Sequence, residues 1–201
     1  MLTAPPVYLA PSSSWAFCRR VFGLLGKGIP PESKNGSEPF ITDGQACKME
    51  WQPLSRTETP DVSDLPPIDY ALFLYHAAKY HFGIMNHLIE ETTYLESLYE
   101  LYENPVAKAS KSRLWYAQHL LVLAFGKSFV SHKRSHGKPA GYAFAARAMA
   151  LLPSQAEMGP DPLLSVQVLT LAAVYLQSVD MRVSAFQYVG DFSVFLPVSI
   201  C

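Results

Sequence analysis

The sequence predicts an all-α fold, a helical bundle or array of antiparallel helix pairs that follows a long N-terminal loop segment. Between residues 68 and 190, apolar side chains recur at helical spacing, and no strand-like alternation of apolar and polar residues competes with it. The five prolines of this range all fall at expected helix ends: Pro105, Pro139, Pro153, Pro160 and Pro162. These local signals agree with one helical architecture.

Composition places the chain among globular proteins. Its 201 residues suffice for one domain with a core, and 49% are hydrophobic against 16% charged. The net charge of −1 gives no general attraction to nucleic acid or to an anionic membrane. Cys18, Cys47 and Cys201 are too far apart for a disulfide framework or a zinc site. This cysteine usage favours a reducing, intracellular environment, and no signal-peptide pattern is evident.

Two segments precede the helical region. Residues 1–26 are expected to form a tail and a short amphipathic helix, capped by Ser12–Ser14 and ended by Gly26. The apolar side of this helix either docks on the core or binds a partner, and docking is favoured because such a face is ordinarily buried. Residues 27–67 hold seven of the sixteen prolines and few hydrophobic residues, which predicts a partly mobile Pro/Gly-rich linker.

Four helices are expected between residues 68 and 152. The first, from about Asp69 to His87, is expected to turn six residues inward: Leu72, Phe73, His76, Ala77, Tyr80 and Ile84. The second opens with the capping-box pattern Thr93-x-x-Glu96 and closes at Asn104–Pro105. The third spans about 112–130, and the fourth spans 139–152, where alanines permit close approach of a neighbour.

Residues 159–190 are expected to form two helices at the centre of the fold. Asp161 is a suitable N-cap, and Pro162 fits the first turn. Apolar residues occur on every side from Leu163 to Leu176, so this helix should be buried, with the other elements packed around it. It is shorter than the roughly twenty apolar residues of a membrane span. Asp180 is the expected cap of the next helix.

The last residues, 191–201 (DFSVFLPVSIC), form an atypical tail. They are apolar and β-prone, and no other strand is predicted for them to pair with. We interpret this tail as a truncated or alternatively spliced end.

The sequence contains no motif that is typical of a catalytic or metal-binding site. No HExxH motif exists, and His132 and His136 stand among basic residues that would repel a cation. Glu96, Glu100 and Glu103 follow helical spacing, which is typical of a solvated face rather than of an acid–base pair. No nucleophile or phosphate-loop motif is present. We therefore expect no catalytic residue, no metal ligand and no cofactor in this chain.

Two sets of residues are candidate sites. Polar tips among apolar helices suggest a regulatory pocket between helices, with core packing as the other interpretation: Trp115, His119, Phe125, Tyr142, Tyr175 and Gln177. The one basic cluster suggests a nuclear-import or phosphate-contacting patch, with a solvated interhelical loop as the other interpretation: Lys127, Lys133, Arg134 and Lys138.

Five segments, taken in their order and spacing, carry a resemblance to a known family: Ser12–Leu25 (SSSWAFCRRVFGLL), Leu65–Leu74 (LPPIDYALFL), Leu114–Lys127 (LWYAQHLLVLAFGK), Ala145–Pro153 (AARAMALLP) and Asp161–Gly190 (DPLLSVQVLTLAAVYLQSVDMRVSAFQYVG). They resemble the fungal-specific transcription factor domain. This domain is the middle regulatory region of fungal binuclear-zinc-cluster transcription factors, including the xylanolytic-activator type. The AFGK segment and the VxxLTLAAVYLQS pattern are the most specific parts.

The resemblance implies a nuclear regulator of RNA polymerase II transcription. Its middle region would be all-helical and would restrain or transmit activation, through the transcription machinery or other regulatory proteins, with a small molecule as a candidate effector. In the family a separate N-terminal cluster of six cysteines holds zinc and contacts DNA. This chain has three cysteines, so zinc and DNA contact are expected only through a separate N-terminal domain.

The same resemblance implies an incomplete helical domain. In the family the helices continue past the equivalent of Gly190, whereas residues 191–201 replace that part here. We therefore expect domain 68–190 to be marginally stable, with exposed apolar surface beside Leu163–Leu176. A free-standing helical-repeat adaptor that binds other proteins is the alternative, although no self-similarity at about 34 residues supports an array.

Overall fold

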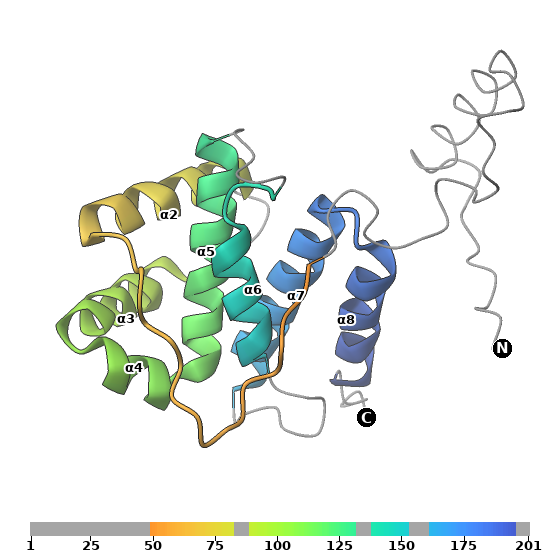
Figure 1. Cartoon of the computed structure of the whole chain (residues 1–201), viewed down its shortest axis with the longest axis horizontal. Coiled ribbons are helices and arrows are strands. Elements are labelled where there is room, and N and C mark those ends of the chain that lie inside the picture. The colour runs from red at the N-terminus through yellow and green to blue at the C-terminus, as the bar shows by residue number, and fades with distance from the viewer. Residues whose placement is uncertain (1–48, 83–88, 132–137, 153–160, 196–201) are drawn as a thin grey trace, which may run out of the picture. The chain divides into compact units, whose positions relative to one another are not determined.

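A computed structural model describes residues 49–82, 89–131, 138–152 and 161–195, and it confirms the all-α fold (Figure 1). Within these ranges the chain forms helices and no strand. The helices are, in order, α2 (Ile68–Phe82), α3 (Glu91–Glu103), α4 (Pro105–Lys111), α5 (Arg113–Val130), α6 (Tyr142–Leu151), α7 (Pro162–Ser178) and α8 (Arg182–Phe195). The tail and short helix predicted for residues 1–26 lie outside the described residues.

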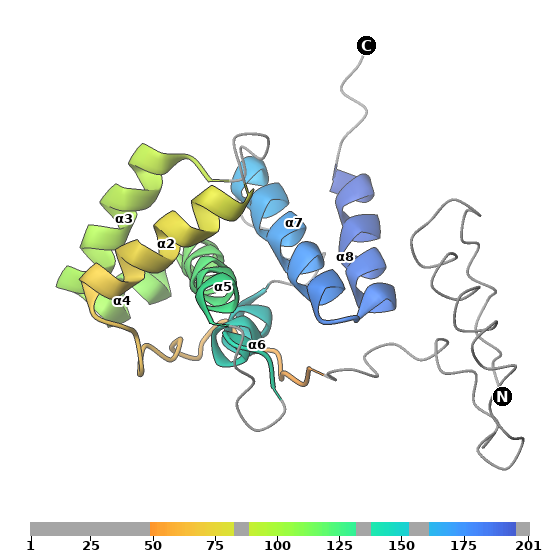
Figure 2. The ribbon, with the colours of Figure 1, turned by 90° about the horizontal axis from the view of Figure 1, so that it is seen from above.

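Helix α5 is the centre of the core. Every residue from Trp115 to Gly126 is buried, and the helix contacts α2, α4, α6 and α7. Figure 2 looks nearly along α5 and shows α2, α6 and α7 around it. The prediction that Leu163–Leu176 is the centre is wrong. That segment, in α7, packs between α5 and α8, and Leu163 at its start is 67% exposed.

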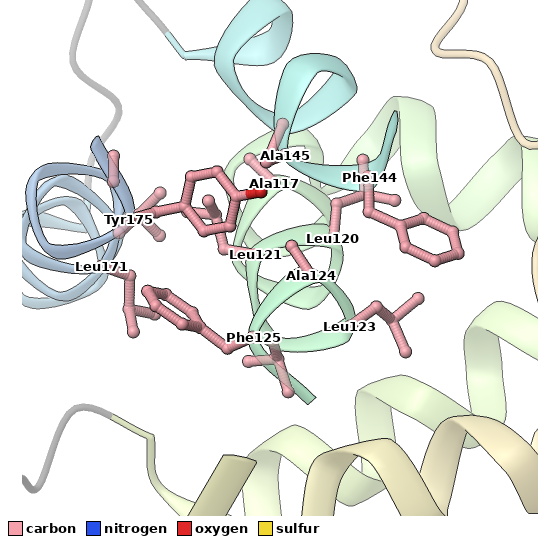
Figure 3. Packing of buried hydrophobic residues seen from close by; sticks show 14 of the residues in the cluster. Ala117, Leu120, Leu121, Leu123, Ala124, Phe125, Phe144, Ala145, Leu171 and Tyr175 are labelled. Carbon is pink, nitrogen blue, oxygen red and sulfur yellow. The ribbon is translucent and has the colours of Figure 1, made fainter. Parts of the chain in front are cut away.

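Two glycines allow the closest approaches to α5. A Cβ atom on Gly126 would lie 2.3 Å from the Leu74 carbonyl oxygen, so α2 crosses α5 with its backbone against this glycine. A Cβ atom on Gly141 would lie 2.3 Å from the Ala124 carbonyl oxygen. Gly141 also has a φ of +82°, in the left-handed region, where it precedes α6. Side chains from α6 and α7 fill the remaining space against α5 (Figure 3).

Helix α2 turns a different face inward from the one predicted. Phe73, His76 and Tyr80 are exposed, whereas the buried residues are Ala71, Leu74, Tyr75 and Ala78. The buried set includes two alanines, and small side chains permit the close crossing with α5. Apolar and aromatic residues occupy both faces of α2, so helical spacing alone does not select between them.

Side chains cap several helices, not always where the sequence predicts. Asp161 caps α7 as expected, because its Oδ1 accepts a hydrogen bond from the Leu164 backbone N–H at 3.0 Å. The predicted capping box at Thr93 is wrong. Instead the carboxylate of Glu90 accepts from the backbone N–H groups of Thr92 and Thr93, at 3.1 and 2.6 Å, so α3 begins earlier, at Glu91.

The last helix corrects two further predictions. Helix α8 runs to Phe195, so residues 191–195 continue a helix instead of forming an atypical tail. Asp180 is not a cap. It has a φ of +68°, and its carboxylate pairs with Arg182 at 2.7 Å. Two apolar side chains of α8 are exposed, 76% for Phe186 and 52% for Val189, and the exposed surface expected beside Leu163–Leu176 stays a prediction.

Residues 49–67, which we call the strap, belong to the predicted linker. They contain no helix, in keeping with their prolines, but they do not form a free linker. The strap, drawn in orange in Figure 1, runs along the helical body before it enters α2. Met49 and Pro60 are buried, and the Leu54 backbone N–H donates to the Ala150 carbonyl oxygen at 2.8 Å.

Candidate functional site

The six residues of the predicted regulatory pocket do not meet in one place. Phe125 and Tyr175 contact each other edge to face across the α5–α7 interface, with ring centroids 5.3 Å apart (Figure 3). The Tyr142 hydroxyl accepts a hydrogen bond from the Glu50 backbone N–H at 3.2 Å. Gln177 is exposed near the end of α7. Phe125 and Tyr175 therefore pack together in the core, whereas Tyr142 contacts the strap and Gln177 faces solvent.

The remaining pair, Trp115 and His119, forms a buried aromatic cluster with Tyr94. The two rings stack one helical turn apart, with centroids 5.5 Å apart and planes 6° apart. The Tyr94 hydroxyl hydrogen-bonds to His119 Nδ1 at 2.8 Å. Burial lowers the pKa of His119 to about 3. The imidazole is therefore neutral and a weak base at neutral pH, which fits core packing better than proton transfer.

Two of the four residues of the predicted basic patch, Lys127 and Lys138, lie within the described ranges. Lys127 lies over the Phe144 ring, with its Nζ atom 5.5 Å from the ring centroid, and Lys138 lies over the Tyr142 ring at 4.4 Å. Lys133 and Arg134 lie outside the described residues. The two placed lysines therefore each contact an aromatic ring on α6.

A polar arrangement that was not predicted from the sequence holds the strap. Arg113 stands in the first turn of α5, and three strap carbonyls converge on its guanidinium. Its Nη1 atom donates to the carbonyl oxygens of Arg56 and Glu58, both at 2.9 Å, and Nη2 donates to that of Leu54 at 3.5 Å. A turn closed by the Glu58 N–H and the Ser55 carbonyl, at 3.1 Å, presents these groups.

Arg147 of α6 holds the next part of the strap. Its Nη1 atom donates to the Ser63 carbonyl oxygen at 2.7 Å, and Nη2 donates to the Asp61 carbonyl oxygen. The Tyr116 hydroxyl of α5 donates to the same Asp61 oxygen at 2.7 Å. The Tyr102 hydroxyl of α3 completes the set by donating to the carbonyl oxygen of Pro66. We call Tyr102, Arg113, Tyr116 and Arg147 the strap site.

Charges at the strap site favour the bound strap. The Asp61 carboxylate lies 3.5 Å from Arg147 Nε. Hydrogen bonds from Ser63, together with the Arg147 charge, lower the pKa of Asp61 despite slight burial. Burial raises the pKa values of Tyr102 and Tyr116 to about 12, so both hydroxyls keep the protons that they donate. The site therefore recognises backbone carbonyls with two cations and two neutral donors.

One signal for this site exists in the sequence. The N-terminal end of a helix carries partial positive charge, so an arginine in the first turn is unfavourable unless it has another partner. Arg113 occupies that position in α5, and its partners are the strap carbonyls. Arg147 gives a weaker signal, as the only charged residue of α6.

The carboxylates considered for acid–base chemistry are spread along α3. Glu96, Glu100 and Glu103 are all exposed, and Glu100 forms an ion pair with Lys108 of α4 at 2.6 Å. Within the described ranges, no three His, Cys, Asp or Glu side chains come together as a metal site would require. No helix of the described part is both long and apolar enough to span a bilayer.

Comparisons with known proteins identify no relative. No protein-family model matches the chain, and no curated protein or solved structure matches it either.

Proposed function

We propose that this chain is a nuclear regulator of RNA polymerase II transcription and that helices α2–α8 form its regulatory domain. The support is the placement of the segments that resemble the fungal-specific transcription factor domain. Leu114–Lys127 lies in α5, Ala145–Leu151 lies in α6, and Pro162–Val189 covers α7 and most of α8. Helices α6 and α7 both contact α5, and α8 contacts α7, so these segments form one continuous core.

Rapid depletion of the chain tests this proposal. The full chain is fused to a degradation tag in the cell that makes it, and nascent RNA polymerase II transcripts are measured within minutes of its loss. A defined set of genes should change, and wild-type re-expression should restore it. The variant Leu121→Asp, which places a charge at a fully buried position of α5, should not restore it. Unchanged nascent transcripts after complete depletion would contradict the proposal.

A helical adaptor is the second candidate, and the strap favours it. The surface of α5 and α6 already holds a non-helical peptide segment through its backbone, which is how many adaptors hold their targets. An adaptor of this kind acts on its partners without altering nascent transcripts directly. The depletion experiment therefore separates the two candidates.

Regulation by a small molecule, the transcription machinery as partner, and DNA contact through a separate N-terminal zinc domain remain parts of the proposal that rest on the resemblance alone. The Trp115–His119 cluster is the place to examine first for a small molecule. Trp115 Nε1 and His119 Nε2 have no hydrogen-bond partner among the described residues, although both side chains are buried.

A further inference from the structure

The polar contacts of the strap are made mainly through its backbone. Six of its carbonyl oxygens accept hydrogen bonds from the four side chains of the strap site. Side-chain burial is uneven along the strap: Met49 and Pro60 are buried, and Trp51, Leu54, Val62 and Leu65 are partly buried against the core, whereas the side chains at 52, 53 and 55–59 are exposed. Release of the strap uncovers these hydrophobic side chains but leaves the helix–helix contacts around α5 in place.

The donors of the strap site come from the rigid part of the molecule. Arg113 and Tyr116 project from α5, whose next ten residues are buried. Arg147 projects from α6, between the buried residues Ala145 and Ala148. The site therefore keeps its geometry when the strap leaves, and it then presents two uncompensated cations and two hydroxyl donors at fixed positions.

The strap also shows which segments such a site would accept. Backbone carbonyls are common to all peptides, so selection comes from shape and charge. The strap carries four acidic residues, Glu50, Glu58, Asp61 and Asp64, against the single cation Arg56, and it buries a proline. An acidic, non-helical segment with a proline in its middle matches the two arginines and the buried Pro60 position.

We propose that the strap site is a binding site for an acidic, proline-containing, non-helical segment of another protein, and that the strap occupies this site in cis. Partner binding then requires release of the strap. The effective concentration of a segment tethered this closely is in the millimolar range. A partner segment must therefore bind tightly enough to compete with the strap at this effective concentration. Any change that weakens the binding of the strap to its site raises the apparent affinity of the site for the partner.

The test uses the full chain and a fluorescently labelled synthetic peptide of residues 49–67 as the probe. Asp61→Arg weakens the cis strap by placing a third cation beside Arg147, at an exposed position that should not disturb folding. This variant should bind the peptide about tenfold or more tightly than the wild type does. Adding Arg113→Gln to Asp61→Arg should remove that gain, because three carbonyl acceptors lose their donor.

The matched control is Glu91→Arg, which reverses the acid of another surface ion pair, Lys79–Glu91, at 2.6 Å between α2 and α3. It should bind the peptide no better than the wild type does. Circular dichroism and urea unfolding verify that each variant is folded. Peptide binding that is equal in wild type, Asp61→Arg and Glu91→Arg would overturn the proposal.

A second measurement uses the wild type alone. Trypsin cleavage after Arg56 requires its backbone to leave the turn that Arg113 holds, because a protease binds its substrate as an extended, accessible chain. Excess peptide carrying Arg56→Gln, which trypsin cannot cut at that position, should accelerate cleavage of the cis strap by replacing it. A cleavage rate that does not respond to the peptide shows that the strap is a permanent part of the core, and it overturns the proposal.

Discussion

Lowering the pH should destabilise this protein through one buried histidine. The pKa of His119 is about 3 in the folded chain because burial disfavours its charged form, and it is about 6.5 in an unfolded chain. Between these values the unfolded chain binds a proton at His119 that the folded chain excludes. The free energy of unfolding therefore falls as the pH falls, by about 1.4 kcal/mol per pH unit once the pH is well below 6.5.

The magnitude follows from the unfolded-state titration. Between pH 7 and pH 5, protonation of a histidine with a pKa of about 6.5 stabilises the unfolded chain by about 2 kcal/mol. Neutral His119 makes its full contribution to the free energy of unfolding above about pH 7. This contribution is lost progressively as the pH falls to about 3. That amount is a large fraction of the stability of a typical small domain, about 5–15 kcal/mol.

Urea unfolding at pH 7 and pH 5 measures this effect. His119→Asn removes the titrating ring and keeps a polar atom near Tyr94, so its loss of stability over this range should be about 2 kcal/mol smaller than that of the wild type. If wild type and His119→Asn lose equal stability, His119 is solvated in the folded chain and the buried cluster is wrong.

Three further predictions concern packing and helix ends. Gly126→Ala should lower the free energy of unfolding by about 1–3 kcal/mol, because the new Cβ meets the Leu74 carbonyl; alanine stabilises an unobstructed helix, so a raised melting temperature would refute the close crossing. Asp161→Ala should cost about 1 kcal/mol by removing the α7 cap, whereas Asp161→Asn should cost little, and equal losses in both variants would argue against capping. At about pH 11, four tyrosines should remain largely protonated because burial raises the pKa of each: Tyr75, Tyr94, Tyr102 and Tyr116; a phenolate signal from all eleven tyrosines in the folded chain would contradict that burial.

The sequence predicts the helices well because their ends have local causes. Asp161 and Pro162 begin α7 as expected, and Asn104–Pro105 ends α3. The short helix α4 was missed, because a proline that ends one helix also suits the first turn of another. Glu90 as an N-cap was also missed, since glutamate is not among the residues that favour this position.

The relative burial of the helices is less predictable. The apolar surface of α7 is continuous around the helix, which suggests a central position, yet α5 with its polar Gln118 and His119 is the more deeply buried. The difference is tertiary, because α5 packs extensively against four helices and α7 against two. The predicted buried face of α2 is wrong for a related reason, since the tyrosines and phenylalanines of this helix suit a core and an aromatic surface equally.

The strap site was not predictable from side-chain patterns. Its acceptors are backbone carbonyls, which every residue has, and its donors come from three different helices, α3, α5 and α6. Composition correctly indicates that residues 49–67 lack helical structure. It gives no information on whether such a segment is free or bound, because that depends on donors such as Arg113 and Arg147 elsewhere in the fold.

Tethering the chain to DNA tests the central functional claim most directly. The full chain is fused to an unrelated DNA-binding module, and transcription from a reporter bearing that module's site is compared with the module alone. A regulatory domain should change reporter transcription severalfold in either direction, and Leu121→Asp should abolish the change with the fusion still present. If the folded wild-type fusion occupies the site and transcription equals that of the module alone, the chain is not a transcription regulator.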